Sequence, residues 1–345
     1  MKITSLIANN IHCGSNYVHY LLSKGNNKWN VLSLRGKKDQ LYDLSIKNLE
    51  LSRYRMLFNI LLVSKILNEI RNTDVILADG IFPYIYGKII RKHVPTIKVF
   101  FLVHNDYSIN NRSNWKLLPK WLFNFIYDFL LRNEKVITTS LSASEGLKKR
   151  SIKSFHIDNG CITPIYGKNK NEDNHILNFW YVGRLVKAKQ VGLLIKAFYN
   201  LPSHCRLNIV GNGDEKEKLN HLSIERNINC KFWGEIEDPF SIIHPGDIFV
   251  LPSLVEGKSI ALMEAILSNC YCIASDIDAN REFEKYNVTL FSVCSVESLN
   301  SKLVFSSQLS QKQRIKITRV DLADQDFSQK EMQKKYIKVF NEKNK

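Results

Sequence analysis

The chain has 345 residues, of which 44% are hydrophobic and 24% are charged. This composition excludes a disordered protein, and the length favours two domains of ordinary size. Seven cysteines without paired spacing favour reduced thiols over a disulfide framework. The densest apolar stretch is too short to cross a bilayer, and the first ten residues lack a signal-peptide pattern. We therefore expect a cytoplasmic protein, with peripheral association at the inner face of the cell membrane as an option.

The net charge of +16 is concentrated in the first half of the chain. Residues 1–170 hold 26 Lys+Arg against 11 Asp+Glu, whereas residues 171–345 hold 23 against 22. A basic half of this kind indicates a face apposed to phospholipid headgroups or to a phosphate-bearing acceptor. Two interpretations stay open for Trp115–Arg132. It is either a helix packed on a sheet or an interfacial segment with Trp115 and Trp121 at headgroup level.

In chain order, short apolar runs alternate with amphipathic helical patterns, which is typical of parallel α/β sheets. The first half reads as strand Lys2–Ala8, helix Tyr17–Ser23, strand Asn30–Leu34, helix Arg53–Glu69, strand Val75–Ala78, helix Tyr84–Arg91, strand Lys98–His104, helix Trp115–Leu131, and strands Lys135–Thr139 and Ser154–Ile157. The second half reads as strand Leu177–Val182, helix Val191–Asn200, strand Leu207–Val210, helix Glu215–Arg226, strands Lys231–Trp233 and Ile248–Leu251, helix Ile260–Ser268, strand Tyr271–Ala274 and helix Lys330–Asn344.

A polar, aperiodic stretch separates the two halves and predicts a linker. We expect one α/β domain over residues 1–168, the linker over 169–176, a second α/β domain over 177–327 and a basic helix over 328–345.

Two strand-end loops of the second half carry groups suited to a phosphate. Open α/β sheets bind ligands at the carboxyl ends of their strands. Gly183 ends one strand, and Arg184 and Lys189 follow as two cations beside a helix start. Gly211 and Gly213 follow the next strand and permit close backbone approach to a ligand. Each loop, taken alone, is more often an ordinary solvated turn.

A third loop carries Glu256, and the helix after it carries Glu264. The amides of Gly257, Lys258, Ser259 and Ile260 lie at the helix N-terminus and face a bound anion. Carboxylates beside a diphosphate need hydroxyl donors, so sugar hydroxyls are reasonable partners for both glutamates. The alternative is a favourable N-terminal charge at Glu256 and a surface position for Glu264.

These segments together resemble glycosyltransferase family 4 on a GT-B fold. Glu256 and Glu264 match its E-x7-E pair, and the similarity covers most of residues 179–283. The N-terminal half is similar at Cys13-Gly14-Ser15, which occupies the family's first glycine loop, and at Val103-His104. The similar second-half segments are FWYVGRLVKAKQVGLLIKAF at Phe179–Phe198, LNIVGNG at Leu207–Gly213 and FVLPSLVEGKSIALMEAILSNCYCIA at Phe249–Ala274.

The resemblance implies two Rossmann-like domains that face each other across a cleft, with the C-terminal helix crossing back to the first. It implies that the first domain takes the acceptor and the second takes a nucleotide-sugar, with a UDP-sugar favoured. Transfer would retain the anomeric configuration and need no metal or other cofactor. The acceptor would be a glycan or a lipid-linked molecule in surface polysaccharide biosynthesis.

The resemblance also implies roles for single residues. Arg184 and Lys189 would clamp the donor diphosphate and oppose the charge that grows on it. Glu256 would bind hydroxyls of the donor sugar and Glu264 those of the ribose. The strand-end His104 would contact the donor sugar from the opposite domain.

Four positions depart from the family pattern. Gln190 replaces the glycine that usually follows the lysine, and Lys258-Ser259 replaces the more frequent Phe-Gly. Asn105 stands where the family often has an acidic residue. The sugar specificity of the family is therefore not carried over.

Asp276-Ile277-Asp278 has the form of a metal-binding DxD, but we interpret it as a turn. The histidines without spaced partners, His12, His19, His93 and His156, are interpreted as structural or surface residues. A GT-B-fold epimerase or phosphorylase is a second hypothesis. A noncatalytic basic binding protein is a third, although the chain lacks the signatures of nucleic-acid binding and we expect no such partner.

Overall fold

The structure is a computed structural model that describes residues 1–9, 14–35, 47–49, 60–105, 119–164, 176–318 and 320–342. The chain forms two compact units, one of Met1–Gly160 with Gln329–Lys345 and the other of Cys161–Ser328. The boundary expected at residue 168, and the linker except for residue 176, lie outside the described residues. Since Gln329–Lys345 belongs to the first unit, the predicted return of the C-terminal helix is confirmed.

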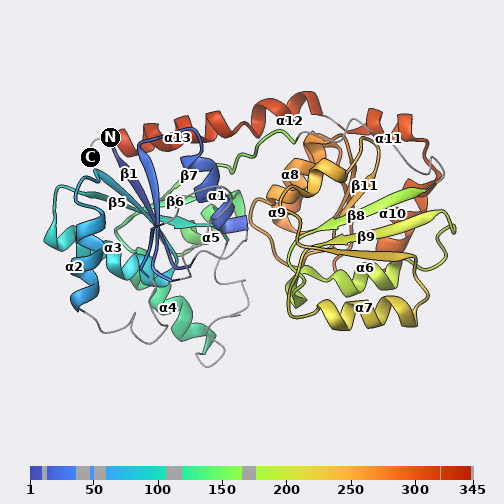
Figure 1. The fold of residues 1–345 in the computed structure, drawn as a ribbon, viewed down its shortest axis with the longest axis horizontal. Helices are drawn as coiled ribbons and strands as arrows, with labels where there is room; N and C mark the ends of the chain where they lie inside the picture. Colours follow the sequence, from blue (N-terminus) through green and yellow to red (C-terminus); the bar gives the residue numbers. More distant parts are fainter. Residues whose placement is uncertain are drawn as a thin grey trace. The chain divides into compact units, whose positions relative to one another are not determined.

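The first unit is built on a seven-stranded parallel sheet with the order β3-β2-β1-β4-β5-β6-β7 (Figure 1). The chain moves outward from β1 in one direction and then from β4 in the other. The loops after β1 and β4 therefore flank the point where the strand order reverses, which is where such sheets bind ligands. The strands are β1 Ile3–Ile7, β2 Trp29–Ser33, β3 Lys47–Asn48, β4 Val75–Asp79, β5 Lys98–Val103, β6 Lys135–Thr138 and β7 Ser154–His156.

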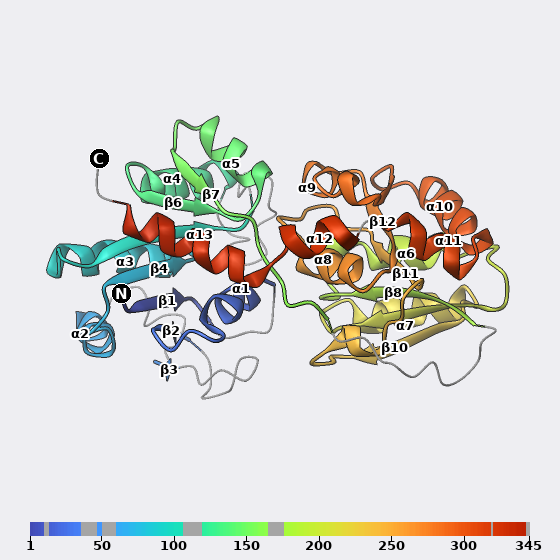
Figure 2. The same ribbon diagram turned by 90° about the horizontal axis from the view of Figure 1, so that it is seen from above.

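Helices cover both faces of this sheet because alternate side chains of each buried strand point to opposite faces. One face packs against α2 to α5 in a single core. The other face carries α1 and α13, and Figure 2 shows α13 running alongside α1. Trp29 and Phe100 on the sheet pack against Phe340 of α13 at ring distances of 5.7 and 4.8 Å. The helices are α1 Gly14–Ser23, α2 Ile60–Glu69, α3 Ile81–His93, α4 Lys120–Leu131, α5 Leu141–Lys148 and α13 Gln329–Asn341.

The second unit repeats this plan with six parallel strands in the order β10-β9-β8-β11-β12-β13. Its reversal point lies between β8 and β11. The strands are β8 Leu177–Val182, β9 Cys205–Val210, β10 Cys230–Gly234, β11 Ile248–Leu251, β12 Tyr271–Ser275 and β13 Thr289–Phe291.

The helices of the second unit also cover both faces of its sheet. One face packs against α6 Val191–Ala197, α7 Lys216–Glu225 and α10 Val296–Gln308. On the other, α8 and α11 pack against β12, and α12 packs on α8. The remaining helices are η1 Lys187–Lys189, η2 Pro239–Ile242, α8 Ile260–Leu267, α9 Asp278–Arg281, η3 Glu284–Tyr286, α11 Gln311–Ile317 and α12 Val320–Asp326.

The predicted α/β class with two parallel sheets is confirmed. Sequence reasoning missed β3 and β13, which have only two and three residues, and also α5, the short α9 and the helices between β13 and α13. In α10 the serines at four of thirteen positions weaken the apolar helical pattern. Among the described residues, no helix is long and apolar enough to cross a membrane.

Truncating Phe340 tests whether α13 is an integral part of the first unit. Phe340 is fully buried, so we expect Phe340→Ala to lower the free energy of unfolding by about 3–5 kcal/mol. Phe305→Ala is the matched control, because that ring is 53% exposed on α10 and should change stability by less than about 1 kcal/mol. Urea unfolding measures both variants. Equal losses in the two would contradict the packing described here.

Candidate active site

In the second unit, the loops after β8 and β11 meet at the reversal point of the sheet. The amide of Leu254 donates to the carbonyl of Ala188 at 2.8 Å. Beside this contact, Lys189 Nζ lies 2.5 Å from Glu256 Oε1, and their side chains are only 21% and 9% exposed. Two residues to which the family resemblance assigns separate roles therefore form one charge-assisted hydrogen bond across the two loops.

Gln190 follows Lys189 in the left-handed region, with φ 49° and ψ 36°. Glycine adopts this conformation without cost, whereas other residues lose about 1–2 kcal/mol there. The glycine usual in the family is therefore explained by the backbone, and here a glutamine accepts the strain. Its buried Oε1 has no hydrogen-bond partner within the described residues.

The glycines after β9 are required by the neighbouring loop. A Cβ on Gly211, at φ 130°, would collide with the carbonyl oxygen of Gly183. One on Gly213, at φ 156°, would collide with that of Leu185. The Leu185 amide also donates to the carbonyl of Asn212 at 2.8 Å, so the β8 and β9 loops pack backbone against backbone. The sequence predicted close approach to a ligand, and the structure shows close approach between two loops.

Arg184 extends from the same loop with an exposed side chain and a fixed backbone. The hydroxyl of the buried Tyr181 donates to the Arg184 carbonyl at 2.9 Å. Burial, and then the charge of Glu256, raise the pKa of Tyr181 well above its ordinary value, so this hydroxyl stays a donor. Gly183 leaves room for it, since a Cβ there would lie 2.8 Å from the Tyr181 oxygen.

The loop after β11 leads through Gly257 into α8. Ser259 caps the helix, because its hydroxyl accepts from the Leu262 amide at 3.4 Å. The amides before Leu262 in the first turn have no acceptor within the helix and suit an anion. Glu264 lies in the second turn, where its charge is second to burial in raising the pKa of Cys161.

Lys258 is held within the second unit. Its ammonium lies 3.0 Å from Glu282 Oε2 and 5.1 Å from the centre of the Phe283 ring. The two charged side chains are only 7% and 11% exposed. Sequence reasoning placed Lys258 close to the donor sugar or the acceptor, whereas Glu282 and Phe283, which it contacts, lie between α9 and η3.

Buried polar atoms without partners gather at these strand ends. Within the described residues they are Ser253 Oγ, Asn280 Oδ1, Glu282 Oε1 and Gln190 Oε1. Ser275 Oγ donates to the Ser253 carbonyl at 2.5 Å, and Asn280 Nδ2 donates to the Ser275 carbonyl at 2.9 Å. Buried polar groups normally have partners, so such a concentration suits a place where ligand or water completes the bonding. Sequence reasoning did not assign Asn280 or Glu282 to the site.

The aspartates of the DxD segment are engaged by one guanidinium. Arg281 Nε donates to Asp276 Oδ1 at 2.6 Å, and Arg281 Nη1 donates to Asp278 Oδ1 at 3.1 Å. Asp276 and Ile277 follow β12, and Asp278 begins the short helix α9, so the segment is a turn only in its first two residues.

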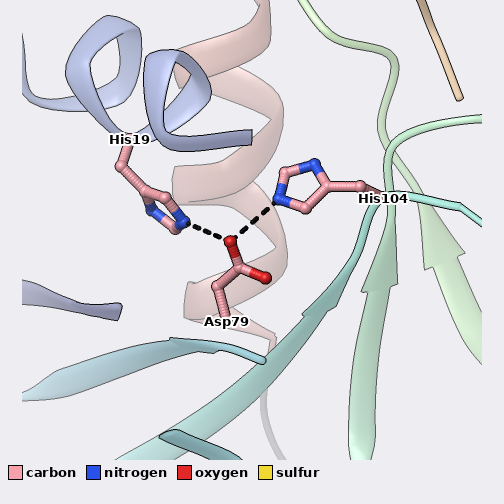
Figure 3. Close-up of side chains that lie close together, drawn as sticks. All are labelled: His19, Asp79 and His104. Atoms are coloured by element: carbon pink, nitrogen blue, oxygen red, sulfur yellow. Dashed lines mark hydrogen bonds and ion pairs between the residues drawn. The ribbon is translucent and has the colours of Figure 1, made fainter. Parts of the chain in front are cut away.

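In the first unit, His104 belongs to a cluster with His19 and Asp79 (Figure 3). Asp79 ends β4, His104 follows β5, and His19 lies on α1. Asp79 Oδ2 accepts from His19 Nε2 and His104 Nε2, at 3.1 Å each. The sequence identified His104 but interpreted His19 as structural and did not single out Asp79. Asp79 and His104 each stand at the end of an apolar run, and this feature of the sequence could have indicated that they belong to one site.

Hydrogen bonding fixes the proton positions of this cluster. Burial would raise the pKa of Asp79, but the charges and hydrogen bonds of the two histidines hold it well below its ordinary value. Burial lowers the pKa of His19, although Asp79 opposes the shift. Trp29 Nε1 donates to Ser5 Oγ at 3.0 Å, and Ser5 Oγ lies 2.9 Å from His19 Nδ1. Because Asp79 is a carboxylate, both histidines donate Nε2–H to it, and when His19 is neutral its Nδ1 accepts from the Ser5 hydroxyl.

The same three groups could hold a metal ion, since their ligand atoms lie within 4.8 Å of one another. The facing atoms of the three groups already hydrogen-bond to each other, and these bonds are sufficient to orient His104. Gly14, the other predicted residue of this unit, begins α1, and a Cβ there would meet nothing within 4 Å. The preceding Cys13 lies outside the described residues.

Alanine at Gly211 tests the packing of the loops after β8 and β9. We expect Gly211→Ala to lower the free energy of unfolding by about 3 kcal/mol, because of the collision and the positive φ. Gly14→Ala is the control and should change it by no more than about 1 kcal/mol. Urea unfolding monitored by fluorescence compares them. If Gly211→Ala were as stable as the wild type, the packing of the two loops would not require glycine at this position.

The pH dependence of stability tests the state of His19. Its pKa is lower in the folded than in the unfolded chain, so below about pH 6.5 the unfolded chain binds more protons. The contribution of the neutral His19 to the free energy of unfolding is fully present above that pH. Acidification removes it, by up to about 1.4 kcal/mol per pH unit. His19→Gln should therefore flatten the decline of Tm between about pH 6.5 and 5.5. His93→Gln, at an exposed position, is the control, and equal slopes in all three proteins would contradict a buried neutral His19.

Comparisons with known proteins show which proteins this chain resembles in sequence and in fold. Residues 166–316 match the family model described as "Glycosyl transferases group 1". The chain is 25% identical over 280 residues to the Staphylococcus aureus capsular polysaccharide biosynthesis glycosyltransferase CapH, covering 75% of this chain and 76% of CapH.

A second relative is from Campylobacter jejuni. It is N-acetylgalactosamine-N,N'-diacetylbacillosaminyl-diphospho-undecaprenol 4-alpha-N-acetylgalactosaminyltransferase, 27% identical over 177 residues, or 49% of this chain and 47% of that protein.

Among solved structures, Anabaena HepE in complex with UDP and glucose superposes with a TM-score of 0.82. It is 15% identical, and the match covers 98% of this chain and 99% of that one. At this identity the likeness shows the fold alone. The chain therefore has the fold of GT-B glycosyltransferases, and its residues 166–316 are similar to the glycosyl transferases group 1 family.

Proposed function

We propose that the chain is a glycosyltransferase of surface polysaccharide biosynthesis that uses a nucleotide-diphosphate sugar, with a UDP-sugar favoured. It transfers the sugar with retention of configuration and needs no metal ion. The observation that carries this proposal is the Lys189–Glu256 pair at the reversal point of the second sheet. The matched domain over residues 166–316 and the UDP bound to HepE support it.

Lys189 suits the donor diphosphate because its partner orients it in advance. An ammonium has three N–H donors, so the bond to Glu256 leaves others for phosphate oxygens. The exposed Arg184 adds a second cation from the same loop. Fixed cations stabilise the charge that grows on the departing diphosphate more than the charge of the bound donor, which is how such groups lower a barrier.

The carboxylates suit hydroxyl groups. Glu256 uses Oε1 for Lys189, and within the described residues its Oε2 has no hydrogen-bond partner. We assign Oε2 to a hydroxyl of the donor sugar and Glu264 to the ribose. The first-turn amides of α8, capped by Ser259, are assigned to a phosphate. The proposed contact of His104 with the donor sugar stays a prediction.

A lipid-linked or membrane-presented glycan is the proposed acceptor. The Campylobacter relative is named for transfer to a diphospho-undecaprenol-linked acceptor, and CapH is named for capsular polysaccharide. The basic first half of this chain suits an acceptor that carries phosphate.

Donor binding is tested by thermal shift with UDP, GDP, UDP-glucose and UDP-N-acetylgalactosamine. We expect one nucleotide-sugar to stabilise the protein, because a ligand that binds only the folded state raises Tm. Product analysis with that donor alone, and with a lipid-linked acceptor, then measures transfer. Conversion of the donor without any acceptor would favour an epimerase instead.

Substitutions in the loop after β8 test the mechanism. We expect Arg184→Ala and Lys189→Ala each to slow transfer about 10²–10³-fold while the protein stays folded. Lys187→Ala is the matched control, since Lys187 lies on the same short helix η1 with an exposed side chain. Near-wild-type turnover in the Arg184→Ala, Lys189→Ala double variant would refute the assignment.

A further inference from the structure

Helix α4 of the first unit has two apolar faces. The inner face packs into the core through Phe123, Tyr127 and Leu130. The outer face carries Trp121, Phe125 and Phe129, whose side chains are 71%, 63% and 68% exposed. These three residues are four positions apart, so they form one row along the helix. We call this row the aromatic face.

The aromatic face is unlike the other exposed apolar side chains of the described residues. Ile224, Phe305 and Tyr199 lie singly on separate segments. Single exposed apolar residues are normal, whereas a continuous row marks an interaction surface. Because the inner face already anchors α4 to its core, folding does not require the outer row.

The charges beside the aromatic face are basic. Lys120 and Arg132 are exposed at the two ends of the helix. At the Phe129 end, Lys88 places its ammonium 5.6 Å from the ring centre. This sign favours an anionic partner along the whole row.

Within residues 120–134, all of which the structure describes, both carboxylates are paired to cations. Asp128 lies 3.8 Å from Arg150. Glu134, only 5% exposed, lies 2.5 Å from Arg91 and 3.2 Å from Lys88. Neither carboxylate therefore opposes an anionic surface.

We propose that the aromatic face docks the first unit onto an anionic phospholipid surface. The rings of Trp121, Phe125 and Phe129 enter the boundary between headgroups and acyl chains, and Lys120 and Arg132 meet lipid phosphates. Tryptophan suits this depth, because its ring is apolar and its N–H is polar. Flanking cations at both ends favour such a surface over a partner protein, which would ordinarily offer charges of both signs.

This inference rests on α4 and the charges beside it, and it goes beyond the proposed function. A failure of docking would leave donor-induced stabilisation unchanged, so the two proposals fail separately.

Vesicle flotation of the full chain tests the docking. We expect binding to vesicles of phosphatidylcholine with phosphatidylglycerol, weaker binding to phosphatidylcholine alone, and weakening by salt. The triple variant Trp121→Ser, Phe125→Ser, Phe129→Ser should lose affinity by at least about tenfold. Ile224→Ser with Phe305→Ser is the control, because it removes two exposed apolar side chains from the second unit and should bind like wild type.

Quenching by brominated lipids supplies a second measurement. Trp121→Phe keeps an aromatic ring but should lose a large share of the quenching of wild-type tryptophan fluorescence. Undiminished quenching in this variant, or wild-type flotation of the triple variant, would overturn the proposal. Equal binding to neutral and anionic vesicles would overturn its electrostatic part. A wild-type dimer that the triple variant converts to a monomer without vesicle binding would assign the face to self-association.

Discussion

The ion pair between Lys189 and Glu256 is the interaction on which the candidate site depends. It joins two loops whose residues are 67 positions apart in the sequence. A carboxylate only 9% exposed is costly to leave unpaired, so each partner constrains the other. The pair thereby fixes the direction of a cation before any substrate arrives. Preorganisation of this kind spares the energy of reorienting the group during the reaction.

Backbone packing around the β8 loop holds in place the loop that carries Lys189. Gly211 and Gly213 let the β9 loop touch the β8 loop, and Tyr181 holds the carbonyl of Arg184 from the buried side. The first unit uses the same plan at its own reversal point. There Asp79 orients two imidazoles, with Ser5 behind one of them. In each unit a buried hydrogen-bond network orients side chains at the carboxyl ends of the strands.

Much of this fold was predictable because buried parallel strands have sequences that are continuous apolar runs. Strands Leu177–Val182 and Ile248–Leu251 match their predictions residue for residue. The partners of the site residues were not predictable. The meeting of His19 with Asp79 depends on β1 lying beside β4, and the turn of Lys258 toward Glu282 depends on a side-chain conformation. Neither the spacing nor the type of the residues shows which side chains meet in the folded chain. Similarity to a family motif can identify a site residue, but it does not identify the residues that contact it.

The division of the chain into units has a consequence for biosynthesis. Cys161–Ser328 is one continuous segment, but the first unit needs Gln329–Lys345 to cover Trp29 and Phe100. On the ribosome, the second unit can therefore complete its core while the first still exposes one face of its sheet. The first unit cannot complete its fold until the segment from Gln329 onward has emerged. The usual order of folding, from N-terminus to C-terminus, is therefore reversed for its final step. Until then its aromatic side chains are open to chaperones.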